Sequence, residues 1–211
     1  MEIIYLNEVD STHTYLKNYI KNNSYKSPIA VVTQNQTDGI GSRSNSWEGL
    51  KGNLFFSFAI DKLMLPSDLP IQSSSIYFSY ILRDVLESVG SKIWLKWPND
   101  FYIENKKIGG TITNLSNNIF FCGIGLNLKY VNNNFGYLDI EFDIKKYLNL
   151  YFDKLESKIS WKQIFSKYSL EFEKSRQMET TINNQKKSLE HSILNGDGSI
   201  FIDNKKVFSL R

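Results

Sequence analysis

The sequence predicts an α+β domain built on a mixed β-sheet with flanking helices, followed by a small β module. Apolar runs of strand length dominate the early part of the chain, and amphipathic helical segments are interspersed among them. Towards the C-terminal end, short apolar segments are split by the turn sequences 195-NGDGS-199 and 203-DNKK-206. We therefore expect one domain at residues 1–177 and a second, smaller one at 178–211.

The first half of the chain alternates strands and helices. Strands are expected at 3–6, 29–34 and 53–60, and helices at about 11–22 and 71–89. Asp10-Ser11-Thr12 is a typical capping signature for the first helix, and Gly90 is a typical stop for the second. The segment 35–52 has no periodicity and is expected to be a loop that closes over a ligand, since loops of this length are usually functional or disordered.

The second half continues the sheet and then adds two helices. Strands are expected at 92–97, 101–104, 107–115 and 119–128, and helices at about 141–156 and 160–174. Pro98 would end the first of these strands, because proline has no backbone donor. A turn at Asn105-Lys106 would join the next two.

Composition excludes several classes of protein. The net charge of +3, from 25 basic and 22 acidic residues, is too small to predict nucleic-acid binding. One cysteine and two histidines cannot supply the four ligands of a structural zinc site within one chain. The apolar runs are too short to span a bilayer, and the N-terminal sequence lacks the pattern of a signal peptide, so a cytoplasmic location is expected.

The segment 33–53 is the first of three that could carry chemistry. Gly39 and Gly41 allow the backbone to pass close to a ligand and to present N–H groups to an anion. Trp47 offers a ring that would stack on a heterocycle. A lone G-x-G pattern is a weak signal, and an ordinary surface loop explains the segment equally well.

The other two segments are 96-KWPND-100 with the following 107-KIGG-110, and 122-CGIGLN-127. If Lys107 points inward, its ammonium group would suit a phosphate or a carboxylate. Asn127 would present an amide that can read the edge of a base. Pattern alone favours plainer interpretations, namely a Pro-Asn-Asp turn with a solvated lysine, and tight packing of a glycine-bearing strand.

Taken together, the motifs of these segments occur in the order and spacing of a known family. They are Ser11-Thr12, Gln36-Thr37-x-Gly39-x-Gly41, Trp47, Gly52-Asn53-Leu54, Lys96-Trp97-Pro98-Asn99-Asp100, Lys107-Ile108-x-Gly110 and Gly123-Ile124-Gly125-Leu126-Asn127. Over residues 1–175 the chain resembles the biotin protein ligases, also called biotin–acetyl-CoA-carboxylase ligases. The resemblance implies a catalytic domain like that of class II aminoacyl-tRNA synthetases, and the tail at 195–210 looks like a shortened SH3-like domain.

The resemblance also implies an activity. Biotin and ATP would bind side by side, and the biotin carboxylate would attack the α-phosphorus as pyrophosphate leaves with Mg²⁺. Biotinyl-5′-AMP would stay bound until it is attacked by a specific lysine of a biotin carboxyl carrier protein, an acetyl-CoA carboxylase subunit. Only ten residues precede Ser11, so the resemblance is to the monofunctional type without a DNA-binding domain. Neither DNA nor a membrane is an expected partner, and the oligomeric state stays open between monomer and homodimer.

The matching positions imply roles for individual residues. Lys107 would lie between the biotin carboxylate and the phosphate and would act electrostatically, not as a nucleophile. The expected biotin-binding residues are Ser11, Thr12, His13, Gln36, Gly39, Lys107, Gly110 and Gly123. His13 stands where many family members carry Asn. The expected ATP-binding residues are Arg43, Trp47, Lys96, Asn99, Lys107 and Asn127. Asp100 would contact Mg²⁺ through a water molecule.

The glycine loop departs from the family pattern GRGRRGRxW, because this chain reads 39-GIGSRSNSW-47. Ile40, Ser42 and Asn45 replace arginines, and only Arg43 remains. The second of the family's arginines helps to hold the reactive intermediate. We therefore expect weaker retention of ATP or of the adenylate, or compensation by Arg43. The loss of a charge-assisted hydrogen bond costs roughly 1.5–3 kcal/mol.

Two alternatives stay open at the level of the sequence. A lipoate or octanoate ligase or transferase shares the fold and the lysine, but the transferases typically use a cysteine nucleophile. Cys122 lies in an apolar strand, where a packed core thiol is favoured over a nucleophile. A non-catalytic biotin-binding protein would explain the lost arginines, although the retained Lys107 argues against it.

Overall fold

The centre of the molecule is a mixed sheet of seven strands in the order β1-β2-β5-β9-β8-β7-β6. The computed structural model describes residues 1–41, 46–47 and 50–208 of the chain. The seven strands are β1 (Glu2–Leu6), β2 (Ile29–Thr33), β5 (Leu54–Asp61), β6 (Trp94–Lys96), β7 (Asp100–Ile103), β8 (Lys106–Ser116) and β9 (Ile119–Leu126). The pair β1–β2 is parallel and the other neighbouring strands are antiparallel. The predicted α+β fold on a mixed sheet is confirmed.

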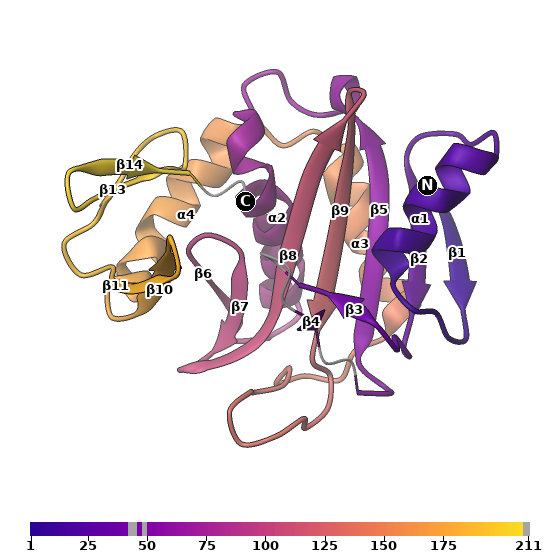
Figure 1. Cartoon of the computed structure of the whole chain (residues 1–211), viewed down its shortest axis with the longest axis horizontal. Helices are drawn as coiled ribbons and strands as arrows, with labels where there is room; N and C mark the ends of the chain where they lie inside the picture. The colour runs from indigo at the N-terminus through magenta and orange to yellow at the C-terminus, as the bar shows by residue number, and fades with distance from the viewer. Residues whose placement is uncertain (42–45, 48–49, 209–211) are drawn as a thin grey trace.

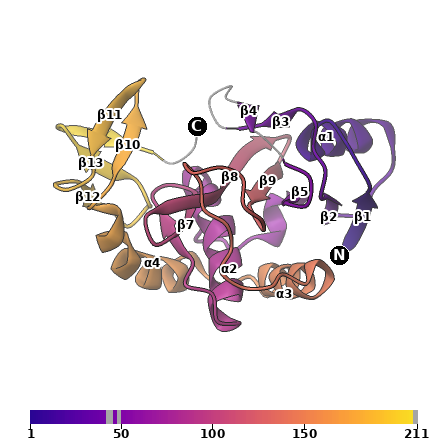
Figure 2. The ribbon, with the colours of Figure 1, turned by 90° about the horizontal axis from the view of Figure 1, so that it is seen from below.

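Helices cover both faces of the sheet. Figures 1 and 2 show α1 (Thr12–Asn22) on one face, and α2 (Ser74–Ser88), α3 (Ile144–Glu156) and α4 (Trp161–Ser175) on the other. The 3₁₀ turns η2 (Lys62–Met64) and η3 (Ile71–Ser73) precede α2. The helix expected at 71–89 therefore opens with a 3₁₀ turn, and it ends before Gly90, whose φ is +102°. None of the helices that the structure describes is long and apolar enough to cross a membrane.

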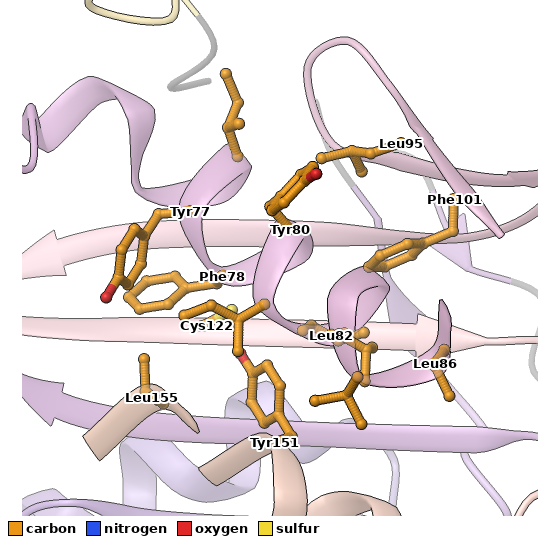
Figure 3. Packing of buried hydrophobic residues seen from close by; sticks show 14 of the residues in the cluster. Tyr77, Phe78, Tyr80, Leu82, Leu86, Leu95, Phe101, Cys122, Tyr151 and Leu155 are labelled. Carbon is orange, nitrogen blue, oxygen red and sulfur yellow. The ribbon is translucent and has the colours of Figure 1, made fainter. Parts of the chain in front are cut away.

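Alternation along the strands divides their side chains between two layers. In β5, Phe56 and Phe58 enter the large core against α2 and α3, while Ala59 joins a smaller core beneath α1. Cys122 of β9 lies in the large core, where Figure 3 shows it close to Phe78. Complete burial raises the pKa of the Cys122 thiol well above its ordinary value. This residue is thus a packed core thiol and not an exposed nucleophile.

Strand β6 lies at one end of the sheet, and α4 supplies hydrogen-bond acceptors for its backbone. Leu95 N donates to Oε1 of Glu171 at 2.5 Å, and Trp97 N donates to Oγ of Ser175 at 3.1 Å. Arg83 of α2 forms an ion pair with Glu171, with 2.5 Å between Nη2 and Oε2. The helical layer therefore fixes the backbone that leads into the KWPND segment.

The C-terminal part of the chain is built from short strands, as the sequence predicts. The strands are β10 (Glu179–Ile182), β11 (Gln185–Ser188), β12 (Ile193–Leu194), β13 (Ile200–Ile202) and β14 (Lys205–Val207). They form a hairpin and a three-stranded sheet, which lie beside α4 (Figure 1). Leu189, Ile200 and Ile202 belong to the same large core as the central sheet. The predicted boundary between two domains, after residue 177, stays a prediction.

The turn at 196–198 is held on the preceding part of the chain by three donors from different elements. The donor–carbonyl pairs are Trp161 Nε1 with Gly196 at 2.8 Å, Ser73 Oγ with Asp197, and Trp97 Nε1 with Gly198 at 2.9 Å. Three consecutive carbonyl groups are thus satisfied by side chains that precede the tail in the sequence. These bonds join the tail to the residue that precedes Pro98.

Substitution Gly198→Ala is expected to lower the free energy of unfolding by on the order of 2 kcal/mol. Gly198 has a φ of +77°, and a Cβ on it would lie 2.5 Å from Oγ of Ser73. Gly196→Ala is the matched control, because a Cβ there would meet nothing within 4 Å. Urea denaturation measures both variants. Equal midpoints for the two would contradict the tight fit of this turn.

Two local predictions are wrong. The segment 35–52 is not a loop throughout, because β3 (Gly39–Ile40) and β4 (Ser46–Trp47) pair as antiparallel strands. Strands of two residues carry no period that a sequence window can detect. The turn between β7 and β8 also comes one residue earlier than predicted, since Glu104 takes a φ of +49° and Lys106 already belongs to β8.

Candidate functional site

A cavity of about 390 Å³ lies on the face of the sheet that carries α1. The sequence-predicted residues that line it are Ser11, Thr12, His13, Gln36, Trp47, Asn99, Asp100, Lys107, Gly110, Gly123 and Asn127. Gly39 and Lys96 are not among the lining residues. The prediction for Arg43 falls outside the residues that the structure describes. So do Ser42 and Asn45, two of the positions where the glycine loop departs from the family pattern. Ile40, the third position that departs from the family pattern, lines the cavity and is 46% exposed.

Strand pairing sets the direction of the cavity. Gly123 of β9 lies opposite Ile112 of β8, and Gly125 lies opposite Gly110. Two residues of a strand span about 7 Å. The cavity therefore follows β9 from an end at Gly123 to an end at Gly125, over a stretch of sheet with few side chains.

The Gly123 end is lined by neutral polar groups. Thr12 N donates to Oε1 of Gln36 at 2.9 Å, and 2.9 Å separates the hydroxyl oxygens of Thr12 and Ser57. Ser11 is the N-cap of α1, and its Oγ accepts from Thr14 N at 3.4 Å. The side chains of Ser11, Thr12, Gln36 and Ser57 are all buried. Buried hydroxyl and amide groups that already bond to one another suit a compact, uncharged ligand group with both donors and acceptors.

His13 adds an imidazole to this end. Its Nε2 lies 2.9 Å from Oδ1 of Asn114, and its Nδ1 is buried with no hydrogen-bond partner in the described part of the chain. Burial lowers the pKa of His13 from 6.5 to about 4, and the positive charge of Lys17 acts in the same direction. The imidazole is therefore neutral at physiological pH.

The buried histidine predicts a stability that depends on pH. The folded pKa of about 4 lies below the unfolded value of 6.5, so the unfolded chain binds more protons between these pH values. We expect the contribution of His13 to lower the free energy of unfolding by roughly 3 kcal/mol as the pH drops from 6.5 to 4. Urea denaturation across this range should show a shallower loss in His13→Asn, and no change of slope in the exposed control His191→Asn. Parallel curves for the wild type and His13→Asn would contradict this.

The Gly125 end carries charge. Lys107 Nζ lies 2.7 Å from Oδ1 of Asp100, and Oδ2 of the same carboxylate lies 3.9 Å from Lys96 Nζ. Burial lowers the pKa of Lys96, and the nearby Asp100 opposes that effect. Lys96 thus lies behind Asp100 and Lys107 lies at the cavity wall. Two ammonium groups and one carboxylate leave this end with a positive field that suits an anion.

Trp47 covers the sheet at the same end. A Cβ on Gly125 would lie 3.0 Å from Cε2 of Trp47, so the indole lies almost directly over that glycine. Lys107 Nζ is 5.8 Å from the centre of a ring of Trp47. A Cβ on Gly39 would come within 2.5 Å of the Trp47 carbonyl oxygen, so Gly39 makes room for β4 rather than touching the cavity.

Two asparagines complete the wall. Asn99 Nδ2 donates to the carbonyl of Thr111, and Asn127 Nδ2 donates to the carbonyl of Gly136 at 3.1 Å. Asn127 also donates from its backbone to Ile108 at 2.7 Å. These bonds hold both carboxamides in fixed orientations at the lining of the cavity.

Sequence reasoning missed several lining residues. Among them are Phe55, Ser57, Ile112, Val131 and Phe135. A period of two places Phe55 and Ser57 on the face opposite to Phe56 and Phe58, so the alternation of β5 could have identified them. Val131 and Phe135 follow β9 in a segment without periodicity, and no sequence signal placed them at the cavity.

No group of three or more His, Cys, Asp or Glu side chains is placed to hold a metal ion in the part of the chain that the structure describes. Asp100 is a carboxylate that lines the cavity. A cation bound here would therefore need most of its ligands from water or from a substrate.

Comparison with known proteins agrees with this geometry. The model of the biotin/lipoate A/B protein ligase family matches residues 5–128. A curated relative, the bifunctional ligase/repressor BirA of Bacillus subtilis (strain 168), is 28% identical over 142 residues, which are 63% of this chain and 42% of the relative. The chain thus spans about two fifths of the length of that relative.

Solved structures match over almost the whole chain. The biotin acetyl coenzyme A carboxylase synthetase of Helicobacter pylori, solved with bound biotinylated ATP, has a TM-score of 0.93 and 38% identity, covering 98% of this chain and 99% of that one. The biotin protein ligase of Aquifex aeolicus, in complex with biotin and ATP, has a TM-score of 0.78 at 22% identity, covering 100% and 96%. The second match supports the fold alone.

Proposed function

The chain belongs to the biotin/lipoate A/B protein ligase family, and from that premise we propose that it activates biotin with ATP and transfers it to protein. The product of the first step is biotinyl-5′-AMP. The acceptor is a specific lysine of a biotin carboxyl carrier protein, the subunit of acetyl-CoA carboxylase that carries the vitamin. We also propose a cytoplasmic location, because ATP and the acceptor protein are found there.

One observation carries the proposal. A single cavity joins a neutral polar end at Thr12, Gln36 and Ser57 to a cationic end at Lys107. Biotin has this polarity, with an uncharged cyclic urea at one end and a carboxylate at the other. The head-group roles of Ser11, Thr12 and Gln36 therefore belong to the proposal, and Gly123 at the neutral end and Gly110 at the cationic end would leave room for biotin along the sheet.

Lys107 would allow two anions to react. A carboxylate oxygen of biotin forms a bond to the α-phosphorus of ATP, the bond to the bridging oxygen breaks, and pyrophosphate leaves. Two unit charges at about 4 Å repel each other by about 4 kcal/mol at an effective dielectric of 20. An ammonium group placed between them offsets this repulsion and stabilises the charge of the transition state. The acceptor amine then attacks the acyl carbon, and AMP leaves.

The nucleotide would lie at the Gly125 end. Trp47 offers a ring face for adenine, and Asn99 and Asn127 present fixed amides to its edge or to the ribose and phosphates. Lys96 would add its charge from behind Asp100. All these residues fall within 1–177, and we propose that 178–211 form a separate module docked on this domain.

Asp100 fits a magnesium ion that arrives with the nucleotide. Mg²⁺ usually keeps several waters and takes only one or two carboxylates together with substrate phosphates, so one cavity-lining carboxylate is enough. The ion would supply neutralisation of the charge on the leaving pyrophosphate. In this chain Asp100 also orients Lys107, since 2.7 Å separates their charged atoms.

Transfer of label tests the proposal. The protein is incubated with radiolabelled biotin, ATP, Mg²⁺ and an apo carrier domain, with lipoate in a parallel reaction. Covalent label on the carrier that requires ATP is the expected result. Binding of biotin without transfer would identify a non-catalytic biotin-binding protein, and a preference for lipoate would identify a lipoate ligase.

A further inference from the structure

A buried hydrogen-bond acceptor at the Gly123 end has no partner in the described part of the chain. It is Nδ1 of His13, a residue that is 8% exposed and lines the cavity. The point where a Cβ on Gly123 would stand lies 3.4 Å from this nitrogen and 3.2 Å from Oγ of Ser57. The absence of a side chain on Gly123 thus leaves room beside two polar atoms. A buried polar atom without a partner costs free energy that a ligand can recover.

The partner of the other ring nitrogen decides what Nδ1 can do. His13 Nε2 lies 2.9 Å from Oδ1 of Asn114, on β8. A carboxamide oxygen only accepts, so Nε2 must carry the hydrogen. In a neutral imidazole the second nitrogen is then an acceptor.

The surroundings keep the ring neutral. His13 lies in the first turn of α1, where the helix dipole disfavours a positive charge. Lys17 on the same helix disfavours it as well, and Phe121 packs edge-on against the ring with 6.4 Å between the centroids. From β8, β9 and β5 the groups that face the ring are the uncharged Asn114, Gly123 and Ser57.

We propose that Asn114 holds His13 in the tautomer whose Nδ1 accepts a hydrogen bond from a ring N–H of the bound cyclic urea. The inference rests on the proposed function and adds to it a positioning residue, Asn114, and a role in specificity for His13. A urea ring has two N–H donors, whereas a dithiolane ring has none. A dithiolane in the pocket would leave Nδ1 buried and unsatisfied, so this pair of residues selects biotin over lipoate.

Nitrogen-15 NMR of the protein labelled at histidine tests the tautomer directly. The chain has two histidines, His13 and the exposed His191, so the second is an internal control. The expected spectrum of the free protein shows His13 with a protonated Nε2 and a bare Nδ1. Saturating biotin should move the Nδ1 signal of His13 in the direction of hydrogen bonding and leave His191 unchanged. A protonated Nδ1 in the free protein, or no response of that signal at saturation, would overturn the inference.

Kinetics of two substitutions provides a second test. Asn114→Leu is expected to raise the KM for biotin about tenfold with little change in kcat, because an interaction made equally in the ground state and the transition state is lost. Thr113→Val is the matched control, since Thr113 bonds to Ser74 of α2 on the opposite face, and its KM should stay at the wild-type value. The preference for biotin over lipoate should fall in Asn114→Leu only.

Two outcomes separate a failure of the inference from a failure of the proposed function. If the wild type biotinylates the carrier while Asn114→Leu keeps the wild-type KM and preference, the inference is wrong and the proposed function stands. If biotin neither binds nor reacts, the proposed function is wrong and the inference is overturned with it.

Discussion

Replacement of Lys107 by alanine is expected to slow biotin-dependent exchange between ATP and pyrophosphate by on the order of 10²–10³-fold. The substitution removes the cation at the cavity wall that would stand between the carboxylate and the phosphate. The effect should fall mainly on kcat, because the charge it stabilises develops in the transition state. Stability should change little. Asp100 keeps a counter-charge in the variant, since Lys96 Nζ lies 3.9 Å from its Oδ2.

A neighbouring lysine separates this effect from a general loss of charge. Lys106 comes directly before Lys107 in β8, is exposed and is not among the residues that line this cavity. Lys106→Ala should retain nearly the wild-type exchange rate. A wild-type rate in Lys107→Ala would remove the role assigned to this lysine. An equal loss in both variants would show that only the overall charge matters.

Glu171→Leu is expected to lower the free energy of unfolding by on the order of 3 kcal/mol. Glu171 is 6% exposed and pairs with Arg83, which is 8% exposed. Without the carboxylate, a buried guanidinium loses a counter-charge and Leu95 N–H loses its acceptor. The N–H is left buried without an acceptor, and the guanidinium keeps only the carboxylate of Glu87, whose side chain is 52% exposed, as a counter-charge.

A surface carboxylate on the same helix is the control. Glu173 pairs with Arg176 at 2.9 Å, but its side chain is 66% exposed, so Glu173→Leu should cost less than about 1 kcal/mol. Glu171→Gln should fall between the two, because an amide oxygen still accepts from Leu95. Guanidinium denaturation gives all three values. Equal stability of Glu171→Leu and Glu173→Leu would contradict the role of the buried pair.

Local patterns were sufficient for most of the fold. The apolar run of β5, the capping signature at 10–12 and the stop at Gly90 each reflect interactions within a few residues, and the structure confirms these elements. The β3–β4 pair was missed because its strands of two residues show no period. The packing of the tail on Trp97 and Trp161 was missed because it joins segments far apart in the chain.

The site was predictable where short motifs marked it. Lys107, Asp100 and Asn127 stand in motifs that the sequence displays, and all three line the cavity. The roles of Ser57 and Asn114 depend on contacts with α1 across 45 and 101 positions of the chain. Such pairings are set by strand order and register, which local periodicity does not encode.

Three of the four tryptophans report on two different parts of the molecule. Trp47 lines the cavity, whereas the indole N–H groups of Trp97 and Trp161 bond to the turn at 196–198. A variant that retains Trp47 alone would have an emission that follows ligand occupancy. A variant that retains Trp97 alone would have an emission that shifts to the red when the tail detaches and the indole meets water. The protein thus contains its own optical probes, one for substrate and one for the seating of its C-terminal end.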